Sequence, residues 1–170
     1  MTEQTLTITI SELQERIAQH LTDIGAYQSV IKTNEHGQFV AEELYCCAYH
    51  YYECGKYSEG IDFFNLLTQM DPESTANWIG LGACHHMLKN YNEALLAYST
   101  ALVLDQTNPT VYLHAANCCF ALKHLAEGFE ALDVVESIAQ KNPEHERLLI
   151  EVDLLREVWS NPDKVCSENK

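Results

Sequence analysis

A 34-residue period is the feature that most limits the folds open to this chain of 170 residues. The period runs without insertion or deletion through 41–74, 75–108 and 109–142. Small residues recur at two positions of each unit and large apolar residues at two others. The small sets are Ala48, Gly82 and Ala116, then Gly60, Ala94 and Gly128; the large sets are Leu44, Trp78 and Tyr112, then Phe64, Tyr98 and Leu132. Because helices cross closely only where side chains are small, the pattern predicts three helical hairpins.

A period of this length with this small and large pattern resembles the tetratricopeptide repeat, a helix-turn-helix unit. The resemblance implies an all-α fold in which three tetratricopeptide repeats form a short right-handed α-solenoid. Tight turns within the repeats are expected at Gly55, Lys89 and Lys123. We expect the six repeat helices at about 39–54, 57–70, 74–88, 91–104, 109–122 and 125–140.

Segments outside the 34-residue register complete the expected organisation. An N-terminal amphipathic helix is predicted after a capping box of Ser11 and Gln14, and a C-terminal helix is predicted to cap the apolar end of the stack. The apolar stripe of the N-terminal helix consists of Leu13, Ile17, Leu21 and Ile24. The expected divisions are a flexible arm at 1–10, the N-terminal helix at 11–36, the repeats at 37–142, the capping helix at 143–160 and a disordered tail at 161–170.

The charge balance excludes two classes of partner. Ten Lys and Arg face 25 Asp and Glu, a formal net charge of −15 that repels a phosphate backbone or an anionic membrane surface. We therefore expect no nucleic-acid partner. The start of the chain has no basic stretch before an apolar core, and no apolar run approaches the roughly 20 residues of a membrane span. We expect a cytosolic protein without membrane insertion.

Three tyrosines on the first repeat helix are the strongest candidates for a binding function. Tyr45, Tyr49 and Tyr52 are spaced i, i+4 and i+7, so they share one helix face, and the repeat core does not need them. In this architecture that face lines the concave side. The predicted groove consists of Tyr45, Tyr49, Tyr52, Ile79, Ala83, His86, Leu113, Asn117 and Phe120. The alternative is that the N-terminal helix or the terminal cap buries these residues.

Missing cations limit what this groove can bind. Residues 41–54, 75–88 and 109–122 contain no Lys or Arg. Tetratricopeptide domains that hold the C-terminal carboxylate of heat-shock proteins use such cations on this face, so the sequence excludes a carboxylate clamp. An uncharged aromatic groove is instead suited to an extended, largely apolar peptide anchored by a few side chains.

Cysteine and histidine clusters raise the competing hypothesis of a metal-dependent enzyme or sensor. His50 and Cys54 are four residues apart, and Cys84 precedes two histidines. No CxxC pair or HExxH motif accompanies them, and small cysteines suit a tight repeat interior. No third group orients a Cys/His nucleophile, and no glycine loop is present for phosphate. We expect neither a metal nor a cofactor, and no enzymatic activity.

Three stretches resemble the translocator class (class II) of bacterial type III secretion chaperones. They are LYCCAYHYYECGKYSEGIDFFNLLTQMD (44–71), WIGLGACHHMLKNYNEALLAYSTALVLD (78–105) and YLHAANCCFALKHLAEGFEAL (112–132). The resemblance implies a chaperone of the bacterial cytoplasm that keeps hydrophobic translocator proteins soluble before export. It also implies that an extended segment near the client's N-terminus, often of Pro-x-Leu-x-x-Pro type, lies in the concave groove. Its motif aromatics fall on Tyr45, Tyr52, Tyr57, Phe64 and Tyr98.

The resemblance leaves oligomeric state and one rival function open. In related chaperones the N-terminal helix commonly mediates a homodimer, which here would use the stripe from Leu13 to Ile24. An amphipathic first helix can equally fold back onto its own groove. The rival function is a generic repeat scaffold that joins folded proteins in another assembly. A scaffold binds folded domains, whereas a chaperone co-purifies with a protein that is insoluble without it.

Overall fold

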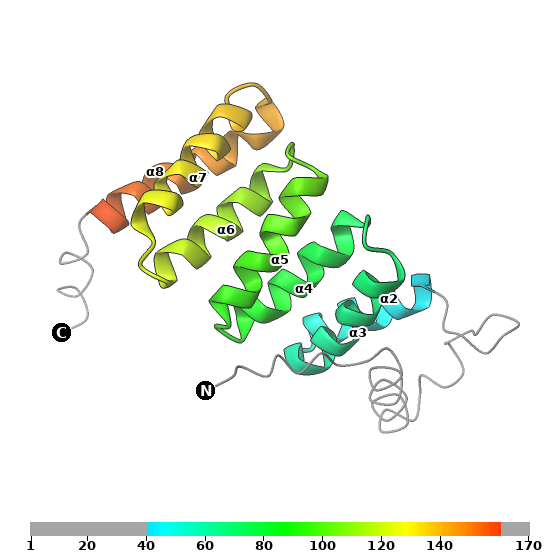
Figure 1. The fold of residues 1–170 in the computed structure, drawn as a ribbon. Coiled ribbons are helices and arrows are strands. Elements are labelled where there is room, and N and C mark those ends of the chain that lie inside the picture. Colours follow the sequence, from blue (N-terminus) through cyan, green and yellow to red (C-terminus); the bar gives the residue numbers. More distant parts are fainter. Residues whose placement is uncertain (1–40, 161–170) are drawn as a thin grey trace, which may run out of the picture. The chain divides into compact units, whose positions relative to one another are not determined.

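Residues 41–160 are described by a computed structural model (Figure 1), and every regular element among them is helical. The elements are α2 (Ala41–Glu53), α3 (Tyr57–Met70), α4 (Thr75–Met87), α5 (Tyr91–Leu104), α6 (Pro109–Ala121), α7 (Leu125–Ala139), the 3₁₀ turn η2 (Pro143–His145) and α8 (Glu146–Ser160). The predicted all-α class is confirmed. The expected arm, N-terminal helix with its stripe Leu13, Ile17, Leu21 and Ile24, and C-terminal tail lie outside the described residues.

The chain divides into two compact units between Lys89 and Asn90. In the first unit α2 and α3 form a hairpin, and α4 packs along α3 and touches α2. Apolar residues repeating every three or four positions bring one stripe of each helix inside. The buried side chains include Leu44, Cys47, Tyr51, Phe63, Phe64, Leu67 and Cys84.

The second unit contains α5 to α8. Helices α6 and α7 form a hairpin, α5 packs on α6, and α8 lies alongside α7 (Figure 1). The core of this unit is made by Leu113, Ala116, Leu132, Val135 and Val152. The predicted capping helix begins as the 3₁₀ turn η2, in which the backbone N–H of Glu144 donates to Oδ1 of Asn142 at 3.1 Å. Regular α-helix follows from Glu146.

Close helix contacts occur where the sequence predicts small residues. Ala48, Ala94 and Ala116 are fully buried. A Cβ added at Gly60 would lie 3.0 Å from Cys84 Sγ, and one at Gly128 would lie 2.8 Å from the ring of Phe120. These two glycines therefore leave room for a side chain of the neighbouring helix.

Side-chain hydrogen bonds mark the junctions between repeats. The Asp71 carboxylate accepts from the backbone N–H of Glu73 at 3.2 Å, and Asp105, 34 residues later, accepts from the N–H of Thr107 at 2.8 Å. Buried Asn77 donates to the carbonyl of Leu67 at 3.3 Å. Such local bonds satisfy backbone groups at helix ends. They give both junctions the same turn, although proline follows Asp71 and glutamine follows Asp105.

The turn residue between the paired helices adopts a left-handed conformation in every repeat. Its φ is +73° at Gly55, +62° at Lys89 and +64° at Lys123. A side chain in this region is strained, whereas glycine is not. We expect Lys123→Gly to raise the free energy of unfolding by about 0.5–1 kcal/mol, measured by urea denaturation. Lys56→Gly is the matched control, because Lys56 has a φ of −89°. Equal effects of the two changes would contradict this account.

Candidate functional site

Two tyrosines of the predicted stripe on α2 form an aromatic face together with Tyr57 of α3. Tyr49 is 50% exposed and Tyr52 is half-buried. Their rings stack with centroids 6.4 Å apart, and Tyr52 in turn meets the ring of Tyr57, on α3, edge-on at 5.5 Å. The i, i+3 spacing of Tyr49 and Tyr52 places their rings on one face of α2.

Tyr45 begins the same stripe but is anchored to the core. Its ring meets Phe64 of α3 edge-on, with centroids 5.8 Å apart. Phe64 is 1% exposed, and a Cβ placed at Gly80 of α4 would lie 2.2 Å from its ring. Phe64 thus fills a space that the missing side chain of Gly80 provides. It supports the tyrosine face from beneath and is closed to a ligand.

The residues predicted on α4 are all partly accessible. Ile79, Ala83 and His86 are half-buried. Burial lowers the pKa of His86, so the imidazole is neutral at neutral pH. Burial, reinforced by the neighbouring phenol of Tyr57, raises the pKa of Tyr52 and keeps its hydroxyl protonated. The residues predicted on this unit are tyrosines, an isoleucine, an alanine and a histidine, so they include no Lys, Arg, Asp or Glu.

The residues predicted on α6 are arranged differently. Leu113 is 2% exposed, in contact with the core that includes Val152 of α8. Phe120 is half-buried, with Trp159 of α8 stacked on its ring and Phe129 of α7 edge-on to it. Asn117 is half-buried as well. The terminal cap therefore buries Leu113 and most of Phe120, as the alternative interpretation of the sequence expects. It does so because α8 needs an apolar surface to pack against.

The motif aromatics serve mainly in packing. Tyr98 is 1% exposed, and its ring stacks on His114 with centroids 5.6 Å apart. Like Phe64, it occupies one of the large apolar positions of the 34-residue period. Tyr57 is half-buried and belongs to the accessible aromatic face.

Three contributors to these faces escaped the sequence reasoning: Gly80, His114 and Trp159. Gly80 is a helical glycine outside the recurring small positions, which is a sign of close packing at that point. Trp159 lies within the predicted capping helix, but its contact with Phe120 depends on how α8 is docked. No feature of the sequence identifies the Tyr98–His114 stack.

The buried thiols of α2, α4 and α6 have little nucleophilic character. Burial raises the pKa of Cys47 to about 11 and that of both Cys84 and Cys118 to about 12. A protonated thiol is a poor nucleophile and a poor metal ligand. Exposed Cys54 lies 3.4 Å from Nε2 of His50. Within 41–160 the structure brings together no group of three His, Cys, Asp or Glu residues suited to a metal ion.

No helix among residues 41–160 is both long and apolar enough to cross a bilayer.

Comparison with known proteins relates the chain to one group. The tetratricopeptide repeat model matches residues 41–73. The low calcium response locus protein H of Yersinia pseudotuberculosis is 28% identical over 150 residues, which span 82% of this chain and 89% of that protein. The type III secretion chaperone SycD of Yersinia enterocolitica, solved with a peptide of the translocator YopD, is 30% identical with a TM-score of 0.67. That match covers 70% of this chain and 91% of SycD.

A second solved complex is similar to this chain to about the same degree. PcrH of Pseudomonas aeruginosa, bound to the chaperone binding region of PopD, is 28% identical with a TM-score of 0.67. The match covers 71% of this chain and 91% of PcrH.

Proposed function

Because the chain belongs to the family of type III secretion translocator chaperones, we propose that it binds hydrophobic translocator proteins in the bacterial cytoplasm and keeps them soluble before export. The relative SycD was solved with a peptide of the translocator YopD, and the relative PcrH with the chaperone binding region of PopD. Holding a client segment requires no bond to be made or broken, so the protein acts without catalysis and without a cofactor.

The aromatic face of the first unit is the proposed peptide site. It consists of Tyr45, Tyr49 and Tyr52 of α2 with Ile79, Ala83 and His86 of α4, all of them at least partly accessible. Tyrosine rings offer a large contact area at low cost in side-chain entropy, and their hydroxyls remain hydrated when the site is empty. This cluster of partly accessible rings is the observation that carries the proposal.

The charge of the face indicates the kind of segment it accepts. The six side chains include no Lys, Arg, Asp or Glu, and burial lowers the pKa of His86, so an apolar peptide bound here buries no unpaired charge. An extended segment with aliphatic or proline anchors fits best, because its apolar side chains can pack between the rings. In the second unit, Asn117 and the accessible part of Phe120 on α6 are separate candidates for contact with a client, whereas Leu113 serves the core.

Removing two rings tests the site. We expect Tyr49→Ala with Tyr52→Ala to weaken binding of a labelled Pro-x-Leu-x-x-Pro peptide by about 2 kcal/mol or more, the range of hot-spot anchors. The measurement is fluorescence anisotropy with the full chain. Circular dichroism should be unchanged, since Tyr49 is exposed and Tyr52 is half-buried.

Two controls make the result specific. Leu96→Ala with Val103→Ala removes two side chains of α5 that are 70% and 79% exposed, and it should leave the peptide affinity unchanged. Co-expression with a translocator should give soluble client with the native chaperone and insoluble client with the tyrosine variant. Full affinity and full client solubility in the tyrosine variant would refute the proposed site.

A further inference from the structure

Helix α8 carries apolar residues on two opposite sides. One side packs on the core: Val152 is 1% exposed, and Leu148, Leu155 and Trp159 lie partly buried beside it. On the other side Ile150 is 71% exposed and Leu154 is 59% exposed. At about 100° per residue, Ile150 and Leu154 share one face, and Val152 points away from both.

The exposed pair is unexpected at this place in the fold. A helix that caps a repeat stack usually presents a polar outer face to the solvent. Single exposed apolar side chains are common, but an adjacent pair at i and i+4 forms a ridge that another helix can pack against. The outer side of α8 therefore has the character of an interface.

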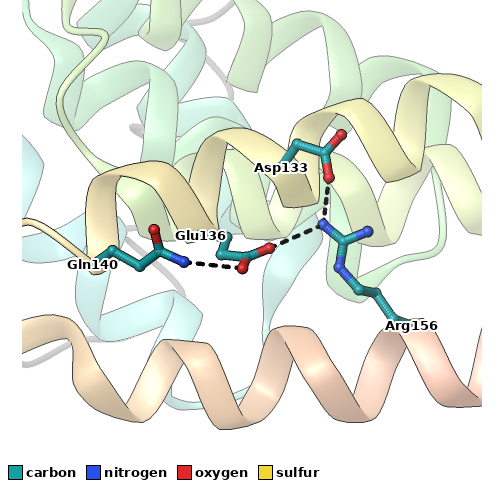
Figure 2. Close-up of polar contacts among 4 residues, drawn as sticks. All are labelled: Asp133, Glu136, Gln140 and Arg156. Atoms are coloured by element: carbon teal, nitrogen blue, oxygen red, sulfur yellow. Dashed lines mark hydrogen bonds and ion pairs between the residues drawn. The ribbon is translucent and has the colours of Figure 1, made fainter.

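Acidic side chains line one edge of this ridge. Glu146, Asp153 and Glu157 are exposed, and their i, i+7 and i+11 spacing places them in one row beside Ile150. Among residues 41–160, the ion pairs in the structure leave all three uncompensated. Arg156 does not neutralise the row, because it turns to Asp133 and Glu136 of α7 (Figure 2).

The contacts in Figure 2 also fix which side of α8 is outward. Arg156 donates to Asp133 and, at 3.4 Å, to Oε2 of Glu136, whose other oxygen accepts from Gln140 at 3.0 Å. This network joins α8 to α7 on the side away from Ile150. The apolar ridge and the acidic row consequently face outward together.

We propose that the outer side of α8, formed by Ile150, Leu154 and the row Glu146, Asp153 and Glu157, binds a basic amphipathic helix of a partner protein. Leucine or isoleucine residues of that helix would pack on the ridge, and its lysines or arginines would pair with the row. We choose a basic partner because of charge complementarity. Binding removes water from the acidic row, and this is costly unless cationic side chains of the partner pair with the carboxylates.

Other occupants fit less well. A second copy of the chain brings a net charge of −15 and repels the row. An anionic membrane or nucleic acid is repelled for the same reason. Within the chain's own last ten residues, 161–170, Val165 and Cys166 are the apolar ones, which is too little to cover the ridge.

A synthetic helix provides the test. The probe is a labelled 18-residue peptide with leucines at i, i+3, i+4 and i+7 and lysines on the flanks, titrated by fluorescence anisotropy against the full chain. Ile150→Ser with Leu154→Ser should weaken binding at least tenfold. Glu146→Gln, Asp153→Asn and Glu157→Gln together should also weaken it and should reduce its dependence on salt.

The controls distinguish binding at α8 from nonspecific attraction to an acidic protein and from binding at the peptide site. Leu96→Ser with Val103→Ser removes an equally exposed apolar pair from α5 and should leave binding unchanged. Tyr49→Ala with Tyr52→Ala should also leave it unchanged, so failure here is distinct from failure of the chaperone proposal. A peptide with the same composition in scrambled order should bind at least tenfold more weakly.

Three results would overturn the proposal. The first is unchanged affinity in the Ile150→Ser, Leu154→Ser variant. The second is an equal loss in the α5 control. The third is a homodimer in sedimentation equilibrium that the α8 double variant dissociates, because the ridge would then bind a second copy of the chain.

Discussion

Phe64→Ala should lower the free energy of unfolding by about 3–5 kcal/mol, the usual cost of removing a fully buried ring. Phe64 is 1% exposed, supports Tyr45 edge-on and fills the space above Gly80. The helix backbones on either side are held by other contacts and cannot close the cavity completely. Urea denaturation followed by far-ultraviolet circular dichroism measures the loss.

The size of this effect distinguishes packing from ligand contact. Removing a side chain that only touches the client would weaken client binding and leave the free energy of unfolding unchanged. For Phe64→Ala we expect a lower free energy of unfolding, and weaker peptide binding only because less of the protein is folded. A Phe64→Ala variant that unfolds at the native urea concentration but no longer binds peptide would contradict the packing role.

Gly80 provides an independent check on the same contact. Alanine favours a helix over glycine by about 1 kcal/mol, yet the new Cβ would overlap the Phe64 ring, and overpacking costs about 1–3 kcal/mol. Gly80→Ala should therefore be destabilising in the native background. In a Phe64→Leu background, where the side chain is shorter, much of this penalty should disappear. Additive effects of the two changes would mean that the residues do not interact.

The helices and turns could be predicted from the sequence because they depend on local and periodic features. The 34-residue repeat places Gly55, Lys89 and Lys123 at the same turn, and all three have positive φ. Helix bounds fall within two residues of those expected for α2 to α7. Each of these features requires only residues close in the chain or one repeat away.

The accessibility of the candidate site could be predicted only in part. The spacing of Tyr49 and Tyr52 fixes their shared face, and the structure brings their rings together. Leu113 occupies the third-repeat equivalent of Tyr45, so periodicity predicts the same exposure for both. The two differ because α8 follows the third repeat and packs on Leu113 through Val152. Periodicity describes equivalent positions and omits what covers the end of the array.

Val152→Asp should release α8 from the second unit and lower the free energy of unfolding by about 3 kcal/mol. Within α8, which the structure describes in full, Val152 is the one fully buried residue, and it lies among Leu113, Leu132 and Val135. The change removes an apolar contact worth about 1.5–3 kcal/mol and places a carboxylate among aliphatic side chains. Detaching α8 avoids burying that charge, so local unfolding is favoured over distortion of the core.

Trp159 reports this release directly. In the native protein its ring is half-buried against Phe120, and detachment would expose it to water. With Trp78 replaced by Phe, the remaining tryptophan emission should shift to longer wavelength in Val152→Asp, and backbone amides of 146–160 should exchange faster with deuterium. The matched control is Leu154→Asp, which introduces the same charge two residues away on the exposed side. That control should change stability by no more than about 0.5 kcal/mol. If both variants kept the native emission and stability, Val152 would not anchor α8, and Leu113 and Phe120 would owe their burial to other contacts.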